Sequence, residues 1–115
     1  MEELIGIARF TFHEGKLEEY KRLSTQAMEI VRSREPGTLE YSVFFNEDET
    51  AAVVVERFRD SDALLEHGAN MGEISEKVLA TADVEGELLG EPSDEIKERL
   101  AGGEQPRLLT PYLSK

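Results

Sequence analysis

The sequence contains no cysteine and no tryptophan, and only two of its 115 residues are histidine. The lack of cysteine excludes disulfides, thiolate nucleophiles, iron–sulfur clusters and zinc sites with cysteine ligands. Nothing in this composition requires an oxidising compartment, so a cytoplasmic protein is expected. His13 and His67 lie 54 positions apart. No transition-metal site is expected from so few ligands.

Basic residues are also scarce, with 13 Lys and Arg against 25 Asp and Glu and a net charge of -12. Such a chain repels phosphate groups, so neither nucleic acid nor an anionic membrane surface is an expected partner. The acidity by itself indicates little beyond solubility. No apolar run approaches the ~20 residues that cross a bilayer, and the acidic start is not typical of a signal peptide. Phosphate-binding loops and dinucleotide fingerprints are missing as well.

The apolar residues that are present fall in periodic blocks, which predict one small folded domain. Residues 4–12 and 38–45 are rich in β-branched and aromatic side chains and predict strands. Residues 51–58 form another apolar run, and the short polar segment 46–50 makes a hairpin with the preceding strand. Residues 16–34 carry apolar side chains at helical spacing.

A second helix is expected to begin at a cap formed by Asp60 or Ser61. Gly68 and Gly72 lie inside it, and each weakens a helix by up to ~1 kcal/mol relative to alanine. The sequence therefore predicts a helix that is broken near residues 68–72. A fourth strand is expected over residues 83–90.

The resulting order, β-α-β-β-α-β, predicts an α+β fold of the ferredoxin-like kind, with four antiparallel strands and the helices on one face. The other face is apolar too, so a homodimer is expected to bury it. Residues 1–90 are expected to form the domain and 91–115 a C-terminal extension. That extension begins with a short helix capped by Ser93, and its apolar tail is expected to pack on the domain or on the partner.

Two motifs resemble the antibiotic biosynthesis monooxygenase (ABM) family of the dimeric α+β barrel superfamily. Residues 35–41 read Glu-Pro-Gly-Thr-Leu-Glu-Tyr, and residues 56–67 read Glu-Arg-Phe-Arg-Asp-Ser-Asp-Ala-Leu-Leu-Glu-His. The resemblance covers roughly residues 4–90. It implies a dimeric barrel and a reaction ranging from quinol oxidation to haem degradation. The haem-degrading members use an Asn/Trp/His set, whereas this chain has Phe58 where the family often has tryptophan. Neither haem nor any other cofactor is expected.

His67 is the candidate catalytic residue, since an imidazole suits proton transfer near neutral pH. The alternative is a core histidine with satisfied hydrogen bonds. Glu56 lies in an apolar strand and is either a base, an anchor for His67 or a structural hydrogen-bonding group. Arg9 faces a substrate oxyanion or, as is favoured, forms an ion pair with Glu56 or an exposed acid. The remaining candidate substrate-binding residues are Tyr41, Asn70, Phe58 and Met71.

The resemblance implies a cofactor-independent monooxygenase that oxidises a phenolic or quinol-type aromatic substrate with dioxygen. In such a reaction the protein deprotonates the substrate in a dry pocket, and the electron-rich anion reacts with dioxygen. The alternative is a non-catalytic dimer that binds a small apolar ligand.

Overall fold

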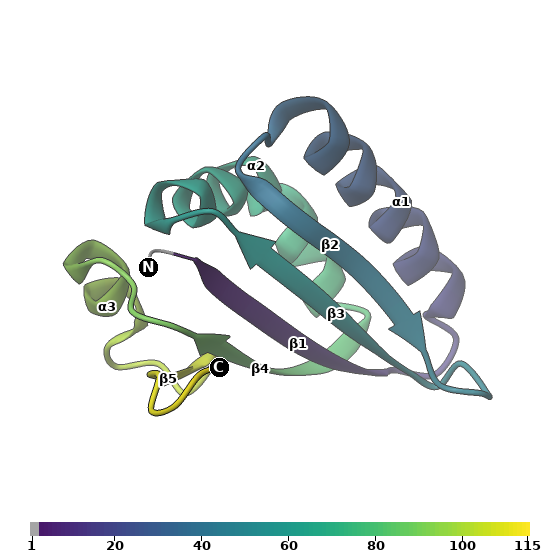
Figure 1. The fold of residues 1–115 in the computed structure, drawn as a ribbon. Coiled ribbons are helices and arrows are strands. Elements are labelled where there is room, and N and C mark those ends of the chain that lie inside the picture. The colour runs from purple at the N-terminus through teal and green to yellow at the C-terminus, as the bar shows by residue number, and fades with distance from the viewer. Residues whose placement is uncertain (1–2) are drawn as a thin grey trace.

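The computed structural model describes residues 3–115, which form one sheet and three helices (Figure 1). In chain order the elements are β1 (Leu4–Phe12), α1 (Leu17–Arg34), β2 (Thr38–Phe45), β3 (Ala51–Phe58), α2 (Ser61–Leu79), β4 (Ala82–Leu89), α3 (Asp94–Leu100) and β5 (Arg107–Leu109). The strand order is β2-β3-β1-β4-β5. The first four strands pair antiparallel, and β5 pairs parallel to β4.

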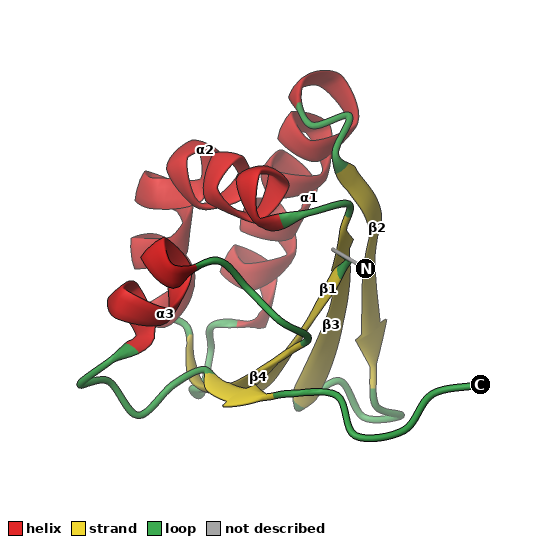
Figure 2. Ribbon diagram, turned by 60° about the vertical axis from the view of Figure 1, so that its left-hand side comes forward, coloured by secondary structure: helices red, strands yellow, loops and turns green. Residues whose placement is uncertain are grey.

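All three helices lie on one side of the sheet (Figure 2). This confirms the expected ferredoxin-like α+β arrangement, to which the C-terminal segment adds a fifth strand. Within residues 3–115, no helix is both long enough and apolar enough to cross a membrane.

The helix α1 buries Tyr20, Leu23, Ala27 and Val31, which recur at the spacing of one helical face. Its partner α2 buries Ala63, His67 and Met71, which lie four residues apart. The Asp60 carboxylate caps α2 by accepting a hydrogen bond of 2.9 Å from the backbone N–H of Ala63.

The expected break in α2 is wrong, because the helix is continuous from Ser61 to Leu79. Two glycines cost a helix about 2 kcal/mol at most. The cap and the packing of a whole buried face offset that amount. A Cβ atom built on either Gly68 or Gly72 would meet no heavy atom within 4 Å, so neither glycine is required by a close approach.

Side chains alternate between the two faces of the sheet. Against the helices, Leu4 and Phe58 are fully buried and join Ala63, Leu88 and Ile96 in one core cluster. The opposite face carries half-buried aliphatic side chains of β1 and β3 and the 56% exposed Phe44. The aliphatic residues on this outer face are Ile5, Ile7, Val53 and Val55.

The C-terminal segment packs on its own chain. Ser93 caps α3, as expected, by accepting a hydrogen bond from the backbone N–H of Ile96. Residues 107–109 then pair with β4. Beyond them the tail does not pack on its own chain, since Tyr112 is 91% and Leu113 is 82% exposed.

Candidate active site

A buried carboxylate at the end of α1 organises the site. The side chain of Glu35 has no exposed surface. Its Oε1 atom lies 2.8 Å from His67 Nδ1 and accepts a second hydrogen bond of 2.8 Å from the Thr38 hydroxyl. Its Oε2 atom accepts a hydrogen bond of 3.0 Å from the Asn70 side-chain amide. Helix α1, strand β2 and helix α2 are thus joined at this one carboxylate.

The imidazole of His67 lies between two carboxyl groups. While Nδ1 faces Glu35, Nε2 lies 3.4 Å from the Oε1 atom of Glu56 on β3. The rings of Tyr41 and Phe58 flank the imidazole, with centroid separations of 5.6 and 5.3 Å. The ring is therefore fixed in position and direction.

The two carboxyl groups have opposite electrostatic environments. Burial pushes the pKa of Glu35 upward, but hydrogen bonds from Asn70, His67 and Thr38 outweigh it and hold that pKa below its usual value. Glu35 is thus a carboxylate, so His67 Nδ1 carries a proton and donates a hydrogen bond to Oε1. This leaves Nε2 as the nitrogen that can exchange a proton with Glu56.

Burial raises the pKa of Glu56, the nearby His67 opposes this rise, and the charge of Glu35 adds to it. A carboxyl group with a raised pKa is a better proton acceptor once it is ionised. Burial, followed by the charge of Glu56, also raises the pKa of the Tyr41 phenol. Tyr41 is therefore a neutral hydroxyl at physiological pH.

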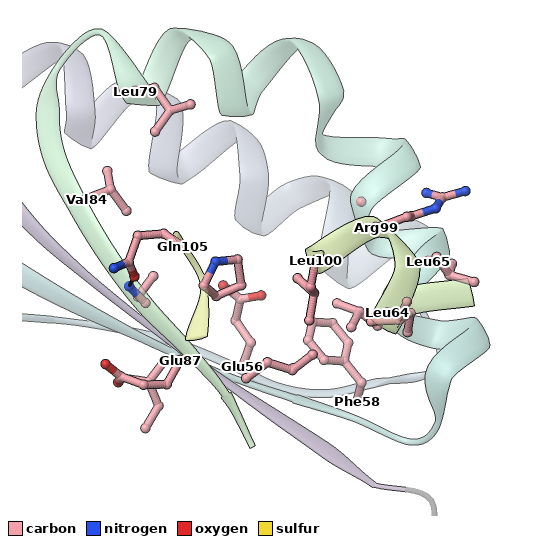
Figure 3. Close-up of a pocket in the computed structure, with 18 residues that line it drawn as sticks. Glu56, Phe58, Leu64, Leu65, Leu79, Val84, Glu87, Arg99, Leu100 and Gln105 are labelled. Atoms are coloured by element: carbon pink, nitrogen blue, oxygen red, sulfur yellow. Dashed lines mark hydrogen bonds between the residues drawn. The ribbon is translucent and has the colours of Figure 1, made fainter. Parts of the chain in front are cut away.

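Glu56 separates two cavities between the helices and the sheet. The larger has a volume of about 470 Å³, within the range of small-molecule sites. Its lining is mostly apolar and includes Phe58, Leu64, Leu65, Leu88, Ile96 and Leu100 (Figure 3). The smaller, of about 110 Å³, is lined by His67, Tyr41 and Met71 among others. Glu56 lines both cavities, whereas His67 lines only the smaller one.

The structure brings together six of the seven residues predicted for the site. His67, Tyr41 and Met71 line the small cavity, Phe58 lines the large one and Glu56 lines both. Asn70 lines neither cavity and contacts the site through Glu35.

Arg9 is the exception. It alternates with Ala8 and points to the face of the sheet away from the helices, where it forms an ion pair with Glu87. The favoured ion pair is confirmed, although its partner is neither Glu56 nor an exposed acid, since the Glu87 side chain is only 11% exposed. Contact between Arg9 and a substrate in either cavity does not fit this placement.

The residue that sequence reasoning missed is Glu35. The hydrogen-bond partner expected for His67 was Glu56, but the bonded carboxylate is Glu35, 32 positions away. One local feature could have indicated it. An acidic residue at a helix C-terminus is unfavourable to the helix dipole, so Glu35 at the end of α1 needs compensating partners elsewhere.

Among residues 3–115, no group of three or more His, Asp or Glu side chains is arranged to hold a metal ion. The carboxyl groups of Glu35 and Glu56 face different nitrogens of the His67 ring and do not converge on one point. The arrangement holds the imidazole between a hydrogen-bonded carboxylate at 2.8 Å and a second carboxyl group at 3.4 Å.

Residues 4–71 match the family model of antibiotic biosynthesis monooxygenases. The match spans more than half of the chain, so the protein belongs to this family. No curated protein sequence matches it.

Several solved structures share the fold. MupZ from Pseudomonas fluorescens superposes with a TM-score of 0.83 at 24% identity, covering 100% of this chain and 94% of MupZ. SnoaB from Streptomyces nogalater, a cofactor-independent oxygenase, gives 0.67 at 21% identity and covers 76% of this chain and 91% of its own. Rv0793 from Mycobacterium tuberculosis gives 0.69 at 24% identity, covering 80% and 96%. At these identities the likeness establishes the fold alone.

Proposed function

We propose that this protein is a cofactor-independent monooxygenase that oxidises a phenolic or quinol-type aromatic substrate with dioxygen in the larger cavity. The observation that carries the proposal is the position of Glu56, a buried carboxyl group with a raised pKa. It stands between an apolar cavity of about 470 Å³ and a fixed imidazole.

In the proposed first step, the Glu56 carboxylate removes a proton from the substrate hydroxyl. The proton passes to Nε2 of His67, 3.4 Å away, and the Glu35 carboxylate stabilises the imidazolium through Nδ1. His67 thus acts as the second member of a relay, because it does not line the cavity that would hold the substrate. The substrate anion remains in a site whose lining is mostly apolar.

In the second step, the electron-rich anion reduces dioxygen and forms a carbon–oxygen bond, giving a peroxide at a ring carbon that bears hydrogen. The relay returns the proton to the outer peroxide oxygen. Loss of water then breaks the oxygen–oxygen bond and leaves a quinone carbonyl. One atom of dioxygen enters the product and the other enters water, while the substrate supplies all the electrons.

The smaller cavity suits the co-substrate. Its volume of about 110 Å³ is less than a quarter of that of the larger cavity, so the larger cavity suits a substituted aromatic substrate better. Dioxygen is much smaller and apolar, and Met71 and Val54 are among the lining residues. We assign this cavity to dioxygen on its way to the substrate anion beside Glu56.

We also propose that two copies pair through the outer face of the sheet. Ile5, Ile7, Val53 and Val55 form an aliphatic patch there, next to the exposed Phe44. Burying such a patch against its own copy would remove it from water.

The test is dioxygen uptake by the purified protein with a panel of quinols and hydroxyanthrones, compared with the variant Glu56→Gln. Steady uptake by the parent protein and a loss of ~100-fold or more in the variant are expected. Binding of these compounds without uptake would favour the alternative, a non-catalytic ligand-binding dimer.

A further inference from the structure

We infer that the C-terminal extension forms one end of the substrate cavity, and that the preferred substrate is an elongated molecule with its polar, reactive group in the middle and an apolar part on either side. This inference deepens the proposed function and rests on it. It is carried by the place of Glu56 along the cavity, by the residues that close one end and by the glycines that keep the cavity open.

Glu56 lies in the middle of the large cavity. Across the sheet it pairs with Gly6, which pairs with Leu88. Phe58 lies on one side of this row, beside the buried Leu4, and Val84 lies on the other side, opposite Phe10. All four of Gly6, Leu88, Phe58 and Val84 line the cavity. In Figure 3 the Glu56 side chain stands between a group with Phe58 and Leu64 and a group with Leu79 and Val84.

When a substrate hydroxyl contacts Glu56, unfilled parts of the cavity therefore lie on both sides of that hydroxyl. A molecule with its polar group at one end would fill only one side and leave the other unoccupied. A molecule with apolar parts on both sides of the polar group would fill both and bury more apolar surface.

The end of the cavity beside Phe58 is closed by the extension. Ile96 and Leu100 of α3 line it, together with Arg99 at its exposed edge. Ile96 is 4% exposed and belongs to the same core cluster as Phe58. The family match ends at residue 71, so this wall lies outside the matched region, although the superposition on MupZ covers it.

Two hydrogen bonds and a strand hold the extension in place. The backbone N–H of Ser93 donates to the Ser61 hydroxyl at 2.9 Å, and the backbone N–H of Gly86 donates to the side-chain carbonyl of Gln105 at 2.7 Å. Pro106 packs against Gly86, since a Cβ atom built on Gly86 would lie 3.6 Å from the Cβ atom of Pro106. The same atom would lie only 3.0 Å from the carbonyl oxygen of Ile7. The next residues of the chain, Arg107–Leu109, form β5 and pair parallel to β4.

The cavity exists partly because side chains are missing from its walls. Gly6, Gly68 and Gly86 all line it. Gly68 faces it from α2, one turn beyond Leu64, and a Cβ atom there would meet nothing within 4 Å. Gly68 is an exposed position at the edge of the cavity, so we expect a larger side chain there to extend over the cavity without a clash. Gly72, one turn further along α2, has equally open surroundings but does not line the cavity.

The experiment measures binding by calorimetry without dioxygen, so that no turnover is needed. The probes are hydroquinone with one tert-butyl group and hydroquinone with two tert-butyl groups on opposite sides of the ring. The parent protein is expected to bind the two-sided probe at least ~10-fold more tightly, since a second apolar group becomes buried. Gly68→Leu should abolish this preference, and its control Gly72→Leu should retain it.

A second pair of variants tests the wall directly. The chain has no tryptophan, so Leu100→Trp supplies a single indole whose emission is expected to change when the two-sided probe binds. Leu113→Trp lies in the same extension but at an 82% exposed position, and its emission should not respond.

In the binding experiment, the inference is overturned if the parent protein does not bind the two-sided probe or binds both probes equally. It is also overturned if Gly68→Leu and Gly72→Leu behave alike. In the fluorescence experiment, it is overturned if the emission of Leu100→Trp does not respond to the probe. The expected binding pattern without dioxygen uptake in air would instead reject the proposed oxidation and leave the shape of the cavity established.

Discussion

The carboxyl groups on the two sides of His67 are the residues on which the proposed chemistry depends, and the fold places them in opposite electrostatic environments. Glu35 accepts three hydrogen bonds and is held as a carboxylate. Glu56 has its pKa raised by burial and faces the cavities. The first group fixes the direction of the imidazole, and the second can gain and lose a proton.

Replacing Glu35 should destabilise the protein in a pH-dependent manner. The lowered pKa of Glu35 means that its stabilisation is fully present above the unfolded value of about 4.5 and is lost as the pH falls through the folded value. Glu35→Gln should therefore lower the free energy of unfolding by about 1.5–3 kcal/mol at pH 7, the scale of hydrogen bonds to a charged group. The difference from the parent protein should shrink in acid.

Thermal melts from pH 3 to pH 8 measure this difference. The control is Glu18→Gln, an exposed position in the first turn of the same helix, which should change the melting temperature little. A Glu35→Gln protein as stable as the parent at pH 7 would contradict the assigned role.

Replacing Glu56 should have the opposite effect on stability. A raised pKa in the folded state means that stability is greatest below the unfolded value of about 4.5 and is lost as the pH rises through the folded value. Glu56→Gln removes this loss, so the variant should melt at a higher temperature than the parent at pH 8 and near the parent value at pH 4.

The same Glu56→Gln preparation should have lost dioxygen uptake, since it lacks the proposed base. A protein that is more stable but inactive is the expected result for a functional group maintained at a cost in stability. Unchanged uptake would remove Glu56 from the mechanism, and a lower melting temperature at pH 8 would show that its burial is not unfavourable.

At the scale of elements, the helix α2 carries both the relay and the opening of the cavity. Its buried face presents His67, while Gly68 faces the large cavity and Gly72 lies one turn further along. These two glycines differ in what depends on them. Both have open surroundings, but Gly68 lines the cavity and Gly72 does not.

Gly72→Ala should therefore stabilise the protein by up to ~1 kcal/mol, because alanine favours the helix and restricts the unfolded chain. Urea denaturation at pH 7 would measure the gain as a shift of the midpoint with an unchanged slope. Binding and turnover should stay as in the parent protein. A loss of stability would indicate that Gly72 has a neighbour that the open surroundings do not include, such as a second copy of the chain.

The elements were largely predictable because each arises from local periodicity. The hairpin of β2 and β3 follows from alternation around residues 46–50, and all eight residues of each strand were anticipated. The expected break in α2 failed for a physical reason, since helix propensity is a weak local effect and tertiary packing overrides it. The short strand β5 could not be predicted, because it depends on β4 rather than on its own sequence.

The candidate site was predictable only in part. His67, Tyr41 and Met71 occur in apolar patterns and are brought together by the register of β2, β3 and α2. Glu35 was missed because its partner is 32 positions away, and its unfavourable place at the C-terminus of α1 is the one local feature that indicates it. A substrate pocket was expected, but its walls were not, since the large cavity results from missing side chains, such as that of Gly6, and from the extension that lines one end.

At the scale of the whole molecule, the two faces of the sheet differ in what covers them. The inner face is covered by helices and contains the cavities and the relay. The outer face carries an aliphatic patch on its central strands, with ion pairs such as Arg9–Glu87 and Arg57–Glu3 around it. A patch of this kind, apolar at the centre and charged at the edge, has the composition of an interface between protein copies.

Val55 is the residue best placed to test the dimer. It lies on the outer face of β3, between Ile7 on β1 and Ser42 on β2. In a dimer through this face, Val55→Asp would bury an unpaired charge from each copy, which costs several kcal/mol. Sedimentation equilibrium of the parent protein should give about twice the chain mass of 12.9 kDa, and Val55→Asp should sediment as a monomer with its far-ultraviolet circular dichroism retained. Gln26→Glu, which adds the same charge at an exposed position of α1, should remain a dimer. A monomeric parent protein at tens of micromolar, or a dimeric Val55→Asp variant, would show that the outer face is not the interface.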